Sequence, residues 1–322
     1  MEASVPTPMQ PIVTLTVNPA LDISTSTEQV MSGHKLRCSA SRLDPGGGGI
    51  NVARVVQRLG GRTLAVYTAG GPAGEAYRRL IEAERLPALV VPIQGSTRED
   101  FTVDETTTGK QFRFVLQGPV LSEPEWRLCL ALLADSIPAG GFVVASGSLP
   151  PGVPEDFYAQ VARLSRQQGA RCIVDASGPA LTAALAEGVF LVKPSRRELG
   201  LHVGATLESA GSQVEAASAL VADGSADHVA LTLGGEGAVL ASKSGILRLA
   251  VPPVPVRSTV GAGDSFLAAF VLRLAQGRGI EAAFRAAVAA GSAAVMTPAT
   301  ELCRRDDVER LEEQLKGQAF GP

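Results

Sequence analysis

The sequence predicts an α/β fold in which helices cover both faces of a mostly parallel sheet. Short, continuously apolar runs alternate with helical patterns along most of the 322 residues. Such runs are typical of strands buried on both faces, and their alternation with helices favours a parallel sheet with ligands at the carboxyl ends of its strands. Apolar residues make up 45% of the chain and charged residues 19%, which is an ordinary balance for a protein with a large core.

Six apolar runs are expected to form the strands of this sheet, because β-branched residues are frequent in them. They are residues 12–17, 64–69, 142–147, 171–176, 189–194 and 228–234. Helical periodicity lies between them, at residues 50–60, 74–86, 154–169 and 212–224. The order of strand and helix is therefore repeated along the chain.

Two segments break this order and alternate between apolar and polar residues. They are HKLRCSASRLD, residues 34–44, and FTVDETTTGKQFRFVLQ, residues 101–117. Alternation of this kind is typical of exposed antiparallel strands, so we expect the two segments to pair as a small sheet that covers a cleft. This lid is expected to span about 23–45 and 95–118 within a single domain, 12–322, which follows a disordered arm at residues 1–11.

Composition and charge give no support for nucleic acid or a membrane as a partner. The net charge is −3, and basic runs with interleaved aromatic residues are absent from the sequence. The four cysteines and three histidines are scattered and form no CxxC pair, so a zinc site is not expected. The first residues do not resemble a signal peptide. We therefore expect a cytoplasmic protein with reduced cysteines.

Two glycine-rich stretches precede helical patterns. DPGGGGIN, residues 44–51, has four glycines that would let the backbone approach a ligand, although they could also form a hinge between lid and core. Ligand contact is the favoured interpretation because Asn51 stands where a helix opens. This stretch is not a Walker A loop, since no Gly-Lys-Ser/Thr follows it.

The second stretch, STVGAGDSFLAAF at residues 258–270, allows two kinds of chemistry. Ser265 could be the nucleophile of a GDS-type hydrolase, but all three histidines precede it, and His228 is expected to be structural. Asp264 could instead be a base beside backbone N–H groups that bind a phosphate. From this stretch alone, a catalytic base and an ordinary helix cap are equally good interpretations of Asp264.

Five motifs, taken together, resemble a known family. They are TVNPALD (16–22), DPGGGGINVAR (44–54), SGSLPPG (146–152), KPSRREL (193–199) and STVGAGDSF (258–266). In this order they are similar to the PfkB (ribokinase-like) carbohydrate kinases, in the phosphofructokinase and tagatose-phosphate kinase branch, and most of all to the bacterial type 2 6-phosphofructokinases. The resemblance extends from about residue 12 to the last helix. It implies a three-layer α/β/α sandwich with a small β-sheet lid.

The resemblance also implies roles for individual residues. Asp264 would be the catalytic base, Lys35 would neutralise charge between the two phosphates, and the anion hole would be formed by Gly261, Ala262 and Gly263. The sugar would be bound by Asp22, Gly46, Gly47, Asn51 and Ser148, and its phosphate by Lys35, Arg98 and Arg37. Without the resemblance, Asp22 would be interpreted as a turn acid and the lid cations as solvated charges.

The nucleotide and its cations are implied in the same way. ATP would be bound by Lys193, Ser195, Thr232, Gly234, Gly237 and Thr259. Mg²⁺ would be held, through water, by Glu198 and Asp175, because Mg²⁺ prefers phosphates together with one or two carboxylates. A monovalent cation, K⁺, would lie at the backbone of Ser258 and Val260. One departure is Ser195, which replaces the asparagine of the family's Asn-x-x-Glu motif and has a shorter side chain.

The expected activity is ATP-dependent phosphorylation of a phosphorylated ketohexose, with fructose 6-phosphate converted to fructose 1,6-bisphosphate as the leading reaction. A homodimer through the lid is expected, because an exposed lid sheet would otherwise be unpaired. Three alternatives stay open. The chain could be a 1-phosphofructokinase or tagatose-6-phosphate kinase, a non-catalytic sugar-phosphate-binding module, or a serine hydrolase.

Overall fold

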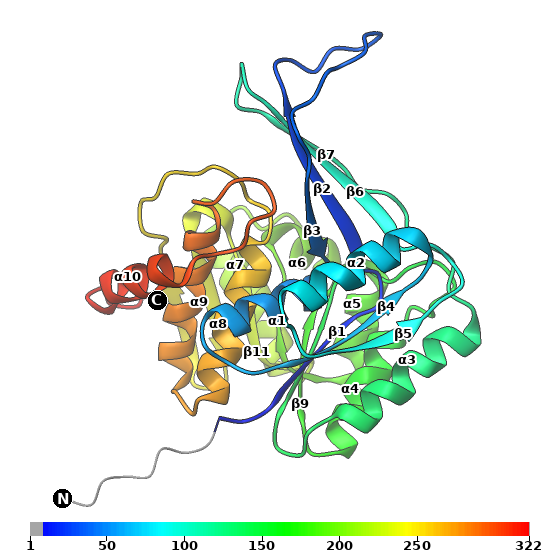
Figure 1. Cartoon of the computed structure of the whole chain (residues 1–322). Coiled ribbons are helices and arrows are strands. Elements are labelled where there is room, and N and C mark those ends of the chain that lie inside the picture. The colour runs from blue at the N-terminus through cyan, green and yellow to red at the C-terminus, as the bar shows by residue number, and fades with distance from the viewer. Residues whose placement is uncertain (1–8, 322) are drawn as a thin grey trace, which may run out of the picture.

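The large sheet crosses the centre of the molecule, as Figure 1 shows. A computed structural model describes residues 9–321. Within them the sheet has nine strands, in the order β13-β12-β11-β10-β9-β8-β1-β4-β5. Neighbouring strands are parallel from β5 to β11, whereas β12 and β13 are antiparallel. The strands are β1 (Ile12–Thr16), β4 (Leu64–Ala69), β5 (Ala88–Pro92), β8 (Phe142–Ser146), β9 (Arg171–Asp175), β10 (Val189–Val192), β11 (Ala226–Thr232), β12 (Ala238–Ser242) and β13 (Gly245–Leu249).

The six strands expected from apolar runs are confirmed as β1, β4, β8, β9, β10 and β11. Their side chains alternate between two cores: Val13 and Leu15 of β1 face one core, and Ile12 faces the other. The prediction missed β5, β12 and β13. Strands β5 and β13 are the edges of the sheet and partly exposed, so they lack a continuous apolar run, and β12 is rich in small residues.

Helices form a layer on each face of this sheet. Side chains of α1, α8, α9 and α10 contribute to one core, and those of α3, α4, α5 and α7 to the other. This three-layer arrangement confirms the predicted fold class. The helices are α1 (Gly48–Arg58), α2 (Gly71–Ala83), α3 (Glu123–Ser136), α4 (Phe157–Gln167), α5 (Gly178–Glu187), α6 (Arg196–Val203), α7 (Ala210–Ala222), α8 (Ala262–Ala275), α9 (Ile280–Ala294) and α10 (Arg305–Lys316).

A second, smaller sheet stands away from the large one at the top of Figure 1. Its strands, in the order β3-β2-β6-β7, are β2 (Ala20–Thr27), β3 (Arg42–Gly46), β6 (Arg98–Glu105) and β7 (Gln111–Phe114). Strand β2 is antiparallel to β3 and parallel to β6. The sheet therefore joins two distant segments of the chain, as the alternating patterns predicted.

The prediction for the first of these segments was wrong in detail. Residues 34–41 form no strand, and the strand begins only at Arg42. No separate strand was predicted at β2, although the expected lid began at about residue 23. This strand lies between β3 and β6, so the two predicted segments do not pair directly. The alternation in residues 34–41 belongs to an exposed loop, residues 28–41, that extends beyond the far end of the small sheet (Figure 1).

The start of the described chain packs against the core. The backbone N–H of Gln10 donates to the carbonyl of Ala275 at 2.7 Å, and Met9 contacts the core shared by α8 and α9. Ordered packing therefore begins before residue 12, where we had placed the domain boundary. The rest of the predicted arm, residues 1–8, lies outside the described residues.

The four cysteines are all free, and three of them are buried. Burial raises the pKa of the Cys129 and Cys172 thiols to about 12 and that of Cys303 to about 11. Cys38 lies exposed in the 28–41 loop of the small sheet. Among residues 9–321, none of the helices has the length and apolar character that a bilayer crossing requires.

Candidate active site

Asp264 lies in the first turn of α8, directly after the predicted glycine loop. Gly261 is the N-cap of this helix and has a left-handed backbone with φ of 72°, which favours glycine. The first N–H groups of a helix have no partner within it and lie at the positive end of its dipole. The loop therefore has the geometry of an anion site, although binding there stays a prediction.

The carboxylate of Asp264 is held by Asn51, which lies in the first turn of α1. The Asn51 Nδ2 donates to the Asp264 Oδ2 at 2.8 Å. Burial raises the pKa of Asp264, and the Asn51 hydrogen bond and the charges of Lys193 and Arg113 oppose this rise. A carboxylate with a raised pKa that is fixed by a neutral donor is suited to accept a proton.

Arg113 is a cation near two of the predicted site acids, and the sequence reasoning assigned it no role. It lies on β7, and its positive charge acts on both Asp22 and Asp264. A signal was present in the QFRFV segment, because alternate residues of a strand share a face. The prediction treated this segment only as a cover and assigned no role to its side chains.

The four glycines at 46–49 lie so close to their neighbours that side chains would not fit. A Cβ on Gly46 would overlap the Asp22 carboxylate, and one on Gly48 would overlap the Ser146 hydroxyl. A Cβ on Gly49 would overlap the carbonyl of Leu15. These contacts join the end of the small sheet to the start of α1, so this stretch is a closely packed joint rather than a loose hinge.

Asp22 lies on β2 among other acids of the small sheet. Across the strands it is paired with Asp44 on β3 and with Asp100 on β6. Burial, and then the charge of Asp100, raise the pKa of Asp22 to about 7, and Arg113 opposes this. In the absence of a ligand, the Asp22 carboxylate is therefore an unfavourable charge near neutral pH.

We expect the Asp22→Asn variant to have a higher free energy of unfolding than the wild type at pH 8, which means that it is more stable. The folded pKa is about 7 and the ordinary pKa of an aspartate is 3.8, so the stability linked to protonation of Asp22 is complete below about pH 4 and is lost as the pH rises through 7. Asparagine removes this loss, and we expect a gain of about 2 kcal/mol at pH 8 that disappears near pH 4. Urea unfolding of the ligand-free protein measures it.

The exposed Asp135 provides the control, because Asp135→Asn should change the unfolding free energy little at either pH. An equal gain for Asp22→Asn at pH 4 and pH 8 would contradict the assignment of the effect to a buried charge.

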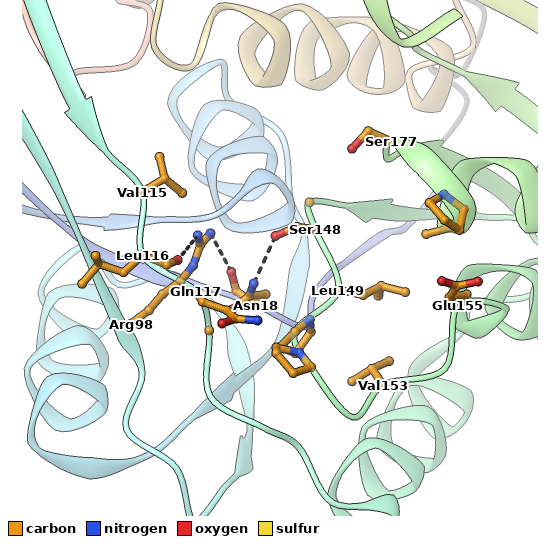
Figure 2. A pocket seen from close by; sticks show the side chains of 16 residues that line it. Asn18, Arg98, Val115, Leu116, Gln117, Ser148, Leu149, Val153, Glu155 and Ser177 are labelled. Carbon is orange, nitrogen blue, oxygen red and sulfur yellow. Dashed lines mark hydrogen bonds between the residues drawn. The ribbon is translucent and has the colours of Figure 1, made fainter. Parts of the chain in front are cut away.

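A first cavity of about 680 Å³ lies beside the end of β8 and contains two of the predicted residues, Arg98 and Ser148. Figure 2 shows it with Arg98 and Asn18 on one side and Glu155 and Ser177 on the other. Arg98 donates to the carbonyls of Asn18 and Leu116 at 3.2 and 3.1 Å. The Asn18 Nδ2 donates to the Ser148 Oγ at 3.1 Å. Asn18 was also missed, although it stands inside the TVNPALD motif.

Lys35 and Arg37 are not brought to these residues within one chain. Both are exposed and lie in the 28–41 loop, which extends away from the large sheet (Figure 1). Among residues 9–321, the Lys35 ammonium has no ion pair within 4.0 Å. Their predicted roles therefore need another position of the loop or a second copy of the chain.

A second cavity, of about 540 Å³, adjoins the glycine loop of α8. Its polar part contains the predicted nucleotide residues Ser195, Thr232, Gly234, Gly237 and Thr259. Its remaining wall is largely apolar and includes Val251, Val254, Phe266, Val288 and Val295. A cavity lined both by apolar side chains and by glycines suits a purine base with attached phosphates.

Lys193 and Asp175 form a buried ion pair at the ends of β10 and β9. The Lys193 Nζ lies 3.1 Å from the Asp175 Oδ1, and it would lie 3.2 Å from a Cβ on Gly263. Burial raises the pKa of Asp175 to about 6, although Lys193 lowers it, and the charges of Asp264 and Glu198 raise it further. Burial lowers the pKa of Lys193, but the nearby acids outweigh it, so the ammonium stays charged.

Ser195 and Glu198 form a capping box at the start of α6. The Ser195 N–H donates to the Glu198 Oε2 at 2.8 Å, and the Glu198 N–H donates to the Ser195 Oγ at 3.3 Å. The serine that replaces the family asparagine therefore fixes the glutamate. Among the described residues, no three His, Cys, Asp or Glu side chains form a complete metal site. Asp175 and Glu198 alone suit Mg²⁺, which takes most of its ligands from phosphates and water.

The segment before the glycine loop packs against the end of α9. The N–H groups of Arg257 and Ser258 donate to the carbonyl of Val295, at 2.7 and 3.3 Å, and the Val260 N–H donates to the Ser258 Oγ at 3.2 Å. Ser265 is fully buried. A fully buried hydroxyl cannot attack a substrate, so Ser265 is not a hydrolase nucleophile.

Known proteins resemble the chain over most of its length. It is 46% identical over 300 residues to an ATP-dependent 6-phosphofructokinase isozyme 2 from Mycobacterium tuberculosis, with 93% of this chain and 88% of that protein covered. It is 42% identical over 301 residues to the Escherichia coli isozyme 2, with 93% and 97% covered. A 1-phosphofructokinase from Bacillus subtilis is 33% identical over 305 residues, with 95% and 98% covered.

Solved structures agree with these relatives. The crystal structure of E. coli phosphofructokinase-2 in complex with potassium matches with a TM-score of 0.92 at 41% identity, covering 96% of this chain and 100% of that one. Its complex with fructose-6-phosphate matches with a TM-score of 0.91 at 40% identity and the same coverage. A model described as pfkB family carbohydrate kinase matches residues 17–307. The chain therefore belongs to the pfkB family of carbohydrate kinases.

Proposed function

We propose that the chain transfers the γ-phosphoryl group of ATP to the 1-hydroxyl of fructose 6-phosphate, which yields fructose 1,6-bisphosphate and ADP. The hydrogen bond between Asn51 and Asp264 supports this most directly. It fixes a base at the start of α8, next to the second cavity, where Gly263 is part of the wall. The identity to relatives named 6-phosphofructokinase isozyme 2 supports the choice of sugar.

In this reaction the phosphate of the sugar binds in the first cavity, beside Arg98 and Ser148, and the sugar ring lies on the side of Asp22 and Asn51. ATP occupies the second cavity. Asp264 accepts the proton of the sugar hydroxyl while the hydroxyl oxygen forms a bond to the γ-phosphorus. The bond between that phosphorus and the bridging oxygen of ADP breaks. Backbone N–H groups of the loop at Gly261–Gly263 stabilise the negative charge on the transferred group, and the Lys193 ammonium lies close to them.

Cations are part of this proposal. Asp175 and Glu198 would hold Mg²⁺ through water, and the ion would supply positive charge to the phosphates of ATP. K⁺ is proposed at the backbone of Ser258 and Val260, and the structure of the E. coli protein in complex with potassium supports the use of this ion. A site at this backbone would precede the glycine loop directly in the sequence.

We also propose that two copies pair through the small sheet. Leu43, Ile23, Phe101 and Phe114 are directly opposite one another across the four strands, and therefore share one face. Leu43, Phe101 and Phe114 are exposed, which leaves an apolar row uncovered in a single chain. The acids Asp22, Asp44 and Asp100 occupy the opposite face. Pairing at the apolar row would also bring the 28–41 loop, with Lys35 and Arg37, near a second copy. Sedimentation equilibrium measures the oligomeric state.

The test of the activity is ADP release with a panel of acceptors. Fructose 6-phosphate, fructose 1-phosphate, tagatose 6-phosphate and unphosphorylated fructose are compared at equal concentration. We expect fructose 6-phosphate to give the highest kcat/KM. A preference for fructose 1-phosphate or tagatose 6-phosphate would keep the mechanism and replace the substrate. Saturable binding without turnover of any sugar would refute the kinase assignment and leave a binding module.

A further inference from the structure

A buried hydroxyl connects the small sheet to the loop that follows α9. Thr300 lies in this loop and is 4% exposed. Its Oγ1 donates to the Asp44 Oδ2 of β3 at 2.6 Å. Since its only hydrogen is used there, the 3.0 Å contact with the Ser24 Oγ of β2 is a bond that Ser24 donates. Thr300 therefore binds two neighbouring strands of the small sheet at once.

Asp44 begins a run of three residues that are fixed by other parts of the molecule. The Asp44 carboxylate also accepts from Arg42 at 2.8 and 2.9 Å. The carbonyl of Pro45 accepts from Arg54 at 3.1 Å, and the carbonyl of Gly46 accepts from the Tyr77 hydroxyl at 2.7 Å. This run ends at Gly46, which is the first of the four glycines that lead into α1.

The position of this run affects the space at the proposed sugar site. Gly46 fits against the Asp22 carboxylate with no room for a side chain, so a shift of β3 changes the space beside Asp22. The chain then enters α1, where Asn51 holds Asp264. A displacement that begins at Asp44 would therefore reach both the proposed sugar ligand and the proposed base.

The backbone of the loop after α9 is itself unusual. Ala299, the residue before Thr300, has φ of 49°, a left-handed conformation that residues with a Cβ rarely adopt. Such conformations persist where surrounding contacts hold them, and they occur often at functional sites. Here the contacts of Thr300 with two strands supply such a constraint.

We propose that Thr300 is a positioning residue for sugar-phosphate binding, which acts through Asp44 and the four-glycine stretch. The inference rests on the proposed function, because it assumes that the Asp22 side of the site takes the sugar. Its consequence is selective: loss of the hydroxyl should weaken the sugar phosphate and leave ATP nearly unaffected, since the second cavity contains no residue of β2 or β3.

The test compares Thr300→Val, which keeps the shape and removes the hydroxyl, with Thr300→Ser, which keeps the hydroxyl. We expect Thr300→Val to raise KM for fructose 6-phosphate about tenfold, as loss of a hydrogen bond to a charged group predicts. KM for ATP should stay within about twofold, and Thr300→Ser should restore most of the sugar affinity.

Thr297→Val is the matched control in the same loop. The Thr297 hydroxyl is also buried, but it donates to the carbonyl of Ala294 and contacts that of Glu301, not the small sheet. This variant should lower the melting temperature without a selective change in either KM. Equal changes in both KM values for Thr300→Val, or a sugar effect of the same size in Thr297→Val, would overturn the inference.

Hydrogen exchange of the ligand-free protein separates this inference from the proposed function. We expect Thr300→Val to speed exchange of the amides at 42–51 more than Thr297→Val does, whatever the substrate is. If the wild type phosphorylates no sugar but this difference is found, the proposed function fails and the positioning contact stands. Unchanged exchange at 42–51 in Thr300→Val would refute the contact even in an active kinase.

Discussion

Asp264→Asn is expected to lower kcat with fructose 6-phosphate by about 10²- to 10⁴-fold, which is the usual contribution of a general base. The carboxamide keeps the size of the side chain and can still accept the hydrogen bond from Asn51. It cannot take the proton of the sugar hydroxyl. Initial rates at saturating ATP and sugar phosphate measure the loss.

The pH dependence distinguishes a lost base from a damaged site. Burial raises the pKa of Asp264, so the wild-type kcat should fall as the pH is lowered and Asp264 gains a proton. The residual activity of Asp264→Asn should lack this fall. ADP binding, measured by calorimetry, should remain close to that of the wild type. A variant that keeps more than about a tenth of the wild-type kcat would exclude Asp264 as the base.

Arg54→Met is expected to lower the free energy of unfolding by about 3–5 kcal/mol, the range found when one partner of a buried ion pair is removed. The Arg54 side chain is 2% exposed, and its Nε lies 2.8 Å from the Glu84 Oε2. The Arg54 Nη2 lies 3.6 Å from the Asp44 carboxylate, and its Nη1 donates to the carbonyl of Pro45. Methionine fills much of the volume but leaves two acids without this cation. Denaturant unfolding at pH 7 measures the effect.

Arg127→Met is the control for this prediction. Arg127 and Glu123 form an ion pair at 2.7 Å on α3, with both side chains 64% exposed. Pairs of this kind contribute about 0.3–0.5 kcal/mol, so this variant should be almost as stable as the wild type. If the two variants lost similar stability, the buried position of Arg54 would not be the reason.

The sequence predicted the parts of the fold that a local pattern determines. Strands such as β1 and β8 are buried on both faces, and their apolar runs are unbroken. By contrast, β2 has the sequence ALDISTST, whose polar residues carry no clear alternation. It becomes a strand because β3 and β6 pair with it on both sides, and pairing between distant segments cannot be read from one segment.

The same difference separates the site residues. Asp264, Asn51 and the four glycines stand in motifs, and the structure brings Asp264 and Asn51 within 2.8 Å although 213 residues separate them. Arg113 acts on Asp264 only because the small sheet folds above it, which no local pattern indicates. Asn18 stands inside a motif, but its contacts with Arg98 and Ser148 also depend on distant segments of the chain. The sequence could not predict where Lys35 would lie, because the 28–41 loop that carries it extends away from the large sheet (Figure 1).

Because Cys38 is exposed, a chemical label can be attached to the 28–41 loop. Thiolates react with maleimides and thiols do not, so the three buried cysteines, with their raised pKa values, should stay unmodified at neutral pH. A fluorescent dye would then attach to the unmutated chain at one place, on the small sheet. Its emission could follow the motion of this sheet in real time as a sugar phosphate or ATP is added.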